Sequence, residues 1–191
     1  IAYGLRADLI TLTIGHLIVT IPFALRLLLA SLAGLDRRIE MAAASLGAMP
    51  AKVKEIAAAI PQSAWRTKPA GGGFSLVEHV CHLRDIDGDG YRVRLERMLT
   101  ETCPSLPDID GDALARQRNY PSQDLPAALA AFTATRLEIV ARLAKLTPEQ
   151  RRRTGLMAGT TEISVGGLVD IMTAHDSEHL DQLNDLVREV G

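Results

Sequence analysis

A run of apolar residues near the start of the chain restricts the fold more than any other feature. Residues 9–35, LITLTIGHLIVTIPFALRLLLASLAGL, carry a single charge, that of Arg26. The 17 uncharged residues from Leu9 to Leu25 approach the length of about 20 residues that an α-helix needs to cross a bilayer. Arg37 and Arg38 follow as a basic flank, which is typical of the cytoplasmic side. The segment is therefore either a transmembrane helix or a buried helix of a soluble protein, and its length and flanking charge favour the transmembrane helix.

From about residue 51 the pattern changes to that of amphipathic helices. The intervening segments, QSAWRTKPAGGG and CPSLPDIDGDALARQRNYPSQ, are rich in turn residues, and alternating β-branched runs are few. Ser75 is a candidate N-cap, and TPEQ at 147–150 has the form of a capping box. These signals predict helices over about 51–59, 75–100, 124–145 and 164–190. The fold class that follows is all-α, an antiparallel four-helix bundle over 51–191, with room for ligands on facing helices.

Two histidines occupy core positions in the last predicted helix. In HDSEHLDQL, residues 175–183, His175 and His179 are four apart and therefore lie on one face of a helix. They continue an apolar stripe with spacings of three or four that includes Met172 and Leu183. Burying an unpaired polar group costs about 1–3 kcal/mol, so each imidazole needs a partner. A metal ion satisfies both at once, and groups on a neighbouring helix would do so separately.

The second predicted helix offers further candidate ligands. The stretch FSLVEHVCHLRD, residues 74–85, places His79 and His82 three apart on one face. Cys81 points about 100° away from His82 and is expected to be a small buried hydrophobe. Glu78, one turn before His82, is a candidate to hold the second ring nitrogen of that histidine.

These stretches together, WRTKP…GGFSLVEHVCHLRD and HDSEHLDQL, resemble the DinB-like metalloenzyme superfamily, which includes bacillithiol transferases of the YfiT type, over about 51–191. The resemblance implies a four-helix bundle that holds a divalent metal ion (zinc, nickel or iron) through His82, His175 and His179. His79 is then the runner-up ligand or a residue that orients a ligand, and Asp176 is a further candidate to orient a ligand. No catalytic acid–base residue is assigned.

The resemblance to this superfamily also implies an activity. Its members use the metal to activate a low-molecular-weight thiol, which is transferred to an electrophile, so we expect a metal-dependent S-transferase. A bundle that binds metal without turnover, as a sensor or interaction module, is the alternative. The expected partners are a small-molecule thiol and an electrophile, with a homodimer as a further expectation.

The segment LAGLDRRIEMAAASLGAMP, residues 32–50, resembles the cytoplasmic coupling loop of ABC transporter permeases of the polyamine type. The matching residues include Glu40, Ala42, Ala43 and Gly47. The resemblance implies that 1–50 is a membrane helix and coupling-loop fragment that contacts an ABC ATPase, with inner-membrane association if 9–35 inserts. Because no second apolar span follows, transport by this chain alone is not expected, and a permease fragment is the third functional hypothesis.

Charge and composition exclude other classes of function. The chain has 21 basic and 23 acidic residues and a net charge of −2, and aromatic residues make up 4%. This balance gives no electrostatic or stacking surface for nucleic acid. Two cysteines are too few for a disulfide framework, so residues 51–191 are expected to be cytoplasmic.

Overall fold

The computed structural model describes residues 9–190, and within the first helix it describes the side chains of residues 13–28 and of those from Met41 onward. The chain divides into two compact units, Ile1–Arg38 and Ile39–Gly191, which are described separately. Helix α1 (Leu9–Ala59) begins in the first unit and ends in the second.

In the first unit, apolar side chains of α1 are exposed, with Ile18 and Phe23 each 66% exposed. No helix in the described part of the chain is long and apolar enough to cross a membrane. The transmembrane helix expected over 9–35 is therefore not supported. Residues 9–12 and 29–35 of that expected span lie outside the residues whose side chains are described.

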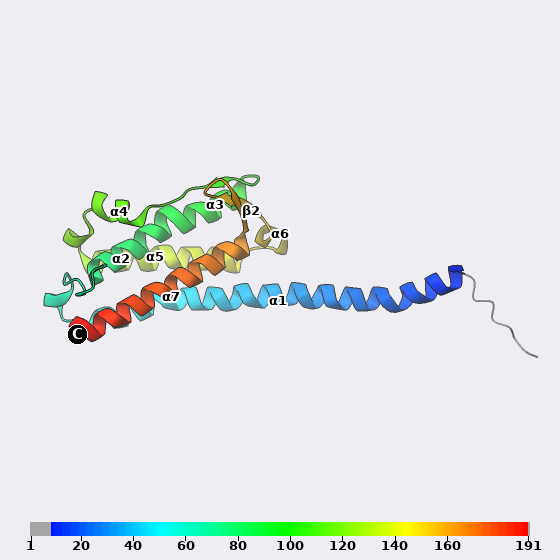
Figure 1. The fold of residues 1–191 in the computed structure, drawn as a ribbon, viewed down its shortest axis with the longest axis horizontal. Coiled ribbons are helices and arrows are strands. Elements are labelled where there is room, and N and C mark those ends of the chain that lie inside the picture. Colours follow the sequence, from blue (N-terminus) through cyan, green and yellow to red (C-terminus); the bar gives the residue numbers. More distant parts are fainter. Residues whose placement is uncertain (1–8, 191) are drawn as a thin grey trace, which may run out of the picture. The chain divides into compact units, whose positions relative to one another are not determined.

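The second unit is a bundle of four helices, as expected (Figure 1). Its members are the C-terminal part of α1, then α2 (Leu76–Asp85) continued by the π-helical η2 (Ile86–Tyr91) and by α3 (Arg92–Thr100), then α5 (Leu125–Ala144), and finally α7 (Val165–Val190). Short elements connect them: η1 (Gln62–Ala64), α4 (Gly111–Gln117), η3 (Tyr120–Ser122) and α6 (Pro148–Arg151). Both predicted caps are present, since Ser75 forms a capping box with Glu78 and Thr147 forms one with Gln150.

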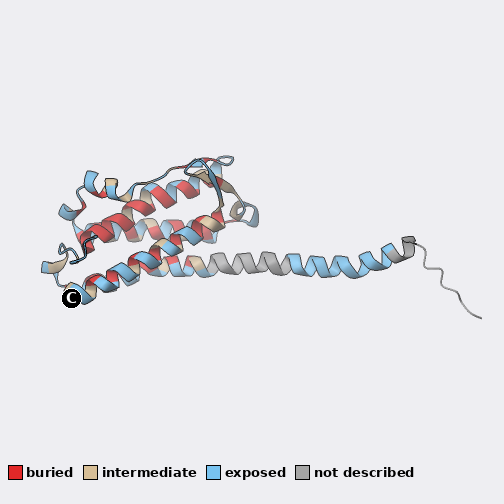
Figure 2. Ribbon diagram, viewed as in Figure 1, coloured by how far each residue is buried: buried red, intermediate tan, exposed pale blue. Residues whose placement is uncertain are grey.

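The bundle core includes residues well before position 51. Leu46 and Met49 on α1 are each 1% exposed, and they pack in two buried apolar clusters together with residues of the other helices. Figure 2 shows these buried positions along the inner faces of the helices. The compact unit accordingly begins at Ile39, and the described residues 41–50 pack as part of the bundle.

This packing gives no support to the coupling-loop expectation for residues 32–50. The segment is one continuous stretch of α1. Ala43 is buried, Ala42 packs beside a core cluster, and a Cβ on Gly47 would lie 3.7 Å from Val140. These small residues therefore allow close helix packing within the bundle. The side chain of Glu40 lies outside the described residues.

A small three-stranded sheet, which the sequence analysis did not predict, covers one end of the bundle. Strand β1 (Ser105–Leu106) pairs in parallel with β2 (Thr154–Met157), and β2 pairs antiparallel with β3 (Thr161–Ser164). Leu106 is 2% exposed and joins the core cluster that includes the start of α7. The sheet therefore anchors the loop after α3 to the segment that leads into α7.

Candidate metal centre

Two facing helices supply the histidines. The capping box of Ser75 fixes the first turn of α2, and both His79 and His82 follow on its buried face. On α7, His179 is buried and His175 is half-buried. Because α2 and α7 are neighbours in the bundle, the two pairs of imidazoles meet between them.

The structure brings His82, His175 and His179 into one group. The Nε2 atom of His175 lies 3.2 Å from Nε2 of His82 and 3.1 Å from Nε2 of His179. The possible ligand atoms of the three residues all lie within 4.8 Å of one another. A metal ion at about 2.0–2.1 Å from each nitrogen requires nitrogens about 3 Å apart, so this donor set fits a divalent ion.

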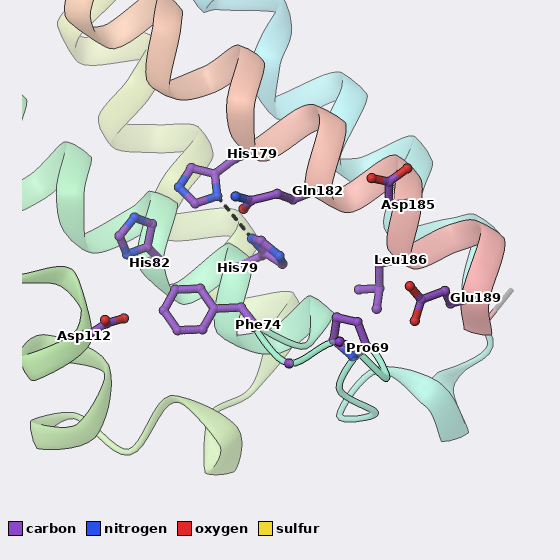
Figure 3. A pocket seen from close by; sticks show the side chains of 13 residues that line it. Pro69, Phe74, His79, His82, Asp112, His179, Gln182, Asp185, Leu186 and Glu189 are labelled. Atoms are coloured by element: carbon purple, nitrogen blue, oxygen red, sulfur yellow. Dashed lines mark hydrogen bonds between the residues drawn. The ribbon is translucent and has the colours of Figure 1, made fainter.

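His79 stands behind the triad. Its Nδ1 lies 3.2 Å from Nδ1 of His179 (Figure 3, dashed line). The Nε2 atom of His179, on the opposite side of the ring, is the one that faces His175. His79 therefore contacts the second nitrogen of a triad histidine, which is the position of a group that orients a ligand.

Burial keeps these imidazoles neutral. Burial, together with the neighbouring histidines, lowers the pKa of His79 and of His175 to about 3 and that of His82 to about 4. The pKa of His179 is also lowered, again chiefly by burial. The neutral imidazole is the form that binds metal ions.

Two polar atoms in the group lack a partner. The Nδ1 atoms of His82 and His175 are buried and have no hydrogen-bond partner among the residues that the structure describes. Gly111, the first residue of α4, comes so close to His82 that a Cβ there would lie 2.6 Å from Cε1 of the ring. The loop between α3 and α5 therefore forms one wall of the histidine group.

Glu78 does not hold His82, contrary to the sequence-based expectation. Its Oε2 accepts hydrogen bonds from the backbone N–H and the hydroxyl of Ser75, at 2.9 and 2.7 Å, and its Oε1 pairs with Lys68 at 2.9 Å. Glu78 occupies the third position of α2, so its carboxylate caps the N-terminus of that helix.

Among the described residues, Asp176 likewise forms its hydrogen bonds away from the triad imidazoles. It is bound by the guanidinium of Arg136, which also binds Asp87 at 2.7 and 2.9 Å. Arg136 is completely buried and Asp87 is 1% exposed. This ionic triad joins α5, η2 and α7, and the sequence analysis did not anticipate it.

Cys81 has the packing role that the sequence predicts. Cys81 is fully buried, and burial raises the pKa of its thiol to about 11, which confirms that it is a buried hydrophobe. Tyr91 is 2% exposed and packs edge-on against His175 with ring centroids 5.9 Å apart. Glu178 accepts a hydrogen bond from Gln182 at 3.2 Å.

A cavity of about 500 Å³ opens onto the histidines (Figure 3). Three of the four site histidines, His79, His82 and His179, line it. Phe74 lies over the α2 histidines, with its ring centroid 5.6 Å from that of His79 and 5.4 Å from that of His82. The other lining residues come from three places, the turn before α2, helix α4 and the C-terminal half of α7: Pro69, Gly71, Gly72, Gly73, Asp112, Gln182, Asp185, Leu186 and Glu189.

Known proteins share both sequence and fold with this chain. Residues 45–183 match the sequence model of the DinB superfamily. A protein of Bacillus subtilis (strain 168) that carries the name "Putative metal-dependent hydrolase YfiT" is 26% identical over 144 residues, which make up 75% of this chain and 80% of that protein. The solved structure of YfiT from Bacillus subtilis, described as having an unusual four-helix bundle topology, covers 81% of this chain and 86% of its own at 24% identity and a TM-score of 0.71.

These similarities concern the bundle, since the family match begins at residue 45. They give no support to the resemblance of residues 1–50 to a permease. The histidine-bearing helices α2 and α7 both begin within the matched region. The chain belongs to the DinB superfamily.

Proposed function

We propose that His82, His175 and His179 together bind one divalent metal ion (zinc, nickel or iron) through their Nε2 atoms. The observation that carries the proposal is the spacing of these atoms, 3.2 and 3.1 Å about His175. Nitrogens at about 2.0–2.1 Å from one metal ion are separated by about 2.9–3.4 Å in octahedral or tetrahedral arrangements. The two distances about His175 therefore match those of nitrogens that share one metal ion.

The surrounding residues prepare this site. Burial keeps the imidazoles neutral, so no proton has to be displaced when the metal binds. With Nε2 of His179 on the metal, its Nδ1 would carry the proton and would donate a hydrogen bond to Nδ1 of His79, which is 3.2 Å away. His79 thereby fixes the tautomer and the ring orientation of His179.

The activity that we propose is transfer of a low-molecular-weight thiol to an electrophile. A divalent ion with three neutral imidazole ligands and an open position stabilises the deprotonated form of a thiol or water near neutral pH. The reaction would break the S–H bond of the thiol, with its proton passing to solvent, form a bond from the sulfur to a carbon of the electrophile, and release the leaving group with its electron pair. The cavity of about 500 Å³ is in the size range of small-molecule sites, and Phe74 and Leu186 give it an apolar wall.

Hydrolysis is the second candidate. The observation that favours it is the printed name of the Bacillus subtilis relative, which describes a metal-dependent hydrolase. The same triad would then activate water in place of a thiol, and the same cavity would hold an ester or amide. The two candidates differ in whether turnover requires a thiol.

The metal site is tested by elemental mass spectrometry of the full chain, purified without a histidine tag. We expect about one equivalent of metal in the parent and almost none in a His175→Ala/His179→Ala double variant. His16→Ala is the matched control, because His16 belongs to the other compact unit, and it should retain the metal. Equal metal contents in the parent and the double variant would overturn the proposed site.

The reaction is tested on the metal-loaded chain. Consumption of a thiol with a halogenated nitroarene tests transfer, and release of nitrophenol from a nitrophenyl ester without thiol tests hydrolysis. Thiol-dependent turnover that the double variant lacks supports transfer, and thiol-independent ester cleavage supports hydrolysis in its place. Metal binding with neither reaction would favour the bundle without turnover.

A further inference from the structure

The charged side chains that line the cavity are acidic. Three acidic side chains line the cavity, those of Asp112, Asp185 and Glu189, and no lysine or arginine is among the described residues that line it. Towards the inner end lies His82, which is 9% exposed and whose buried Nδ1 has no partner among the described residues. The cavity thus combines a metal-binding floor with an acidic outer end.

Helix α7 connects these two ends. The turns after His179 place Gln182, Asp185, Leu186 and Glu189 on the cavity wall (Figure 3). At a rise of about 1.5 Å per residue, the two acids stand about 9 and 15 Å along the helix from His179. The helix ends at Val190, so the negative end of its dipole adds to the same charge.

The acidic side chains of α7 use only part of their hydrogen-bonding capacity. Asp185 pairs with Arg188 at 2.5 Å, and both side chains are more than half exposed. Glu189 accepts one hydrogen bond, from the backbone N–H of Ala70 at 3.1 Å. Since a carboxylate offers about four acceptor positions, both groups keep acceptor sites for a ligand.

Between the two ends the wall is apolar, formed by Pro69, Phe74 and Leu186. We propose that the cavity selects an aminothiol, with its sulfur at the histidine triad, an apolar chain over Phe74, and an ammonium group beside Asp185 and Glu189. This inference rests on the proposed function and specifies, in addition, that the thiol substrate carries a positive charge. A thiol with a carboxylate at its far end would meet the acidic wall and be repelled.

Three thiols of equal length test the charge preference: 6-amino-1-hexanethiol, 6-mercapto-1-hexanol and 6-mercaptohexanoic acid. Their binding to the zinc-loaded full chain is measured by titration calorimetry at low salt. An exposed ion pair corresponds to a roughly two- to fivefold change in affinity. Because two carboxylates, Asp185 and Glu189, face the ligand, we expect 6-amino-1-hexanethiol to bind about tenfold more tightly than 6-mercapto-1-hexanol. We expect 6-mercaptohexanoic acid to bind most weakly.

The variant Asp185→Asn/Glu189→Gln should reduce the amine-to-alcohol ratio to about one. Asp181→Asn is the matched control, because Asp181 is an exposed acid of the same helix that does not line the cavity, and it should leave the ratio unchanged. At about 1 M salt, where the Debye length is about 3 Å, the ratio should also fall in the parent.

The outcomes distinguish failure of the aminothiol inference from failure of the proposed thiol transfer. Equal affinities for the three thiols, or a preference that Asp181→Asn removes as fully as the double variant does, would overturn the aminothiol inference and leave the proposed function in place. Failure of all three thiols to bind a chain that holds one equivalent of zinc would overturn thiol transfer as well.

Discussion

Gly111 should be essential for tight metal binding, although it is not a ligand. A Cβ at this position would lie 2.6 Å from Cε1 and 3.0 Å from Nδ1 of His82. Ordinary contact begins at 3.4 Å, so the ring would have to retreat by about 0.8 Å, from 3.4 − 2.6. Metal–ligand distances tolerate only about 0.2 Å. We therefore expect Gly111→Ala to weaken metal binding by roughly 10- to 100-fold, the usual effect of disturbing a ligand's support.

The measurement is a competition titration of zinc against a chromophoric chelator, alongside thermal unfolding of the metal-free chain. Gly88→Ala is the control, since a Cβ there has nothing within 4 Å. Alanine is a better helix former than glycine by up to about 1 kcal/mol, so loss of affinity in Gly111→Ala cannot come from the backbone of α4. If Gly111→Ala binds zinc as tightly as Gly88→Ala does, the loop is not a wall of the site and the reasoning fails.

Three other predictions follow from the same geometry. His79→Ala should weaken zinc binding about tenfold without abolishing it, because His179 loses the group that orients it; the same competition titration measures this, and an unchanged affinity would contradict it. Arg136→Met should lower the free energy of unfolding in urea by about 3–5 kcal/mol, because it leaves Asp87 and Asp176 buried without a cation, and Asp87→Asn/Arg136→Met/Asp176→Asn should recover much of the loss. The pKa values of the site histidines are lowered to about 3 or 4 in the folded state from 6.5, so the unfolded chain binds more protons below pH 6.5. Stability of the metal-free chain should therefore fall as the pH drops from 6.5 towards 4, by up to about 1.4 kcal/mol per pH unit for each such histidine, and urea unfolding at several pH values checks the slope.

Local sequence patterns predicted those parts of the site that depend on one helix at a time. The spacing of His175 and His179 on an apolar stripe places both on the inner face of α7, and Ser75 marks the start of α2 as expected. Helical periodicity also predicted the four helices of the bundle, because each buries a continuous apolar face.

Features that depend on contacts between distant segments could not be predicted in this way. Arg136 lies in an amphipathic helix where an arginine normally faces solvent, and only the acids of η2 and α7 explain its burial. The strands of the small sheet are two to four residues long, too short for an alternating pattern. The contact between Gly111 and His82 depends on how the long loop after α3 folds back onto α2. The start of the bundle within α1 could not be located, because the apolar run continues into the part of the helix that packs in the core.

Two consecutive residues of α7, His175 and Asp176, belong to two separate buried networks. This arrangement explains how the histidine side chains are positioned without an ion pair of their own. His175 faces the neutral histidine group, while Asp176, about 100° further round the helix, binds Arg136. The ion pairs to Asp176 and Asp87 tie the middle of α7 to α5 and η2 and so fix its rotation about its own axis. Because Arg136 binds Asp87 of η2 and Asp176 of α7, α7 is anchored by ionic contacts. Among the described residues, the site imidazoles make hydrogen-bond contacts with one another and with no carboxylate. The ligand atoms of His82, His175 and His179 are therefore positioned by the packing of helices, with His79 as the adjacent orienting group.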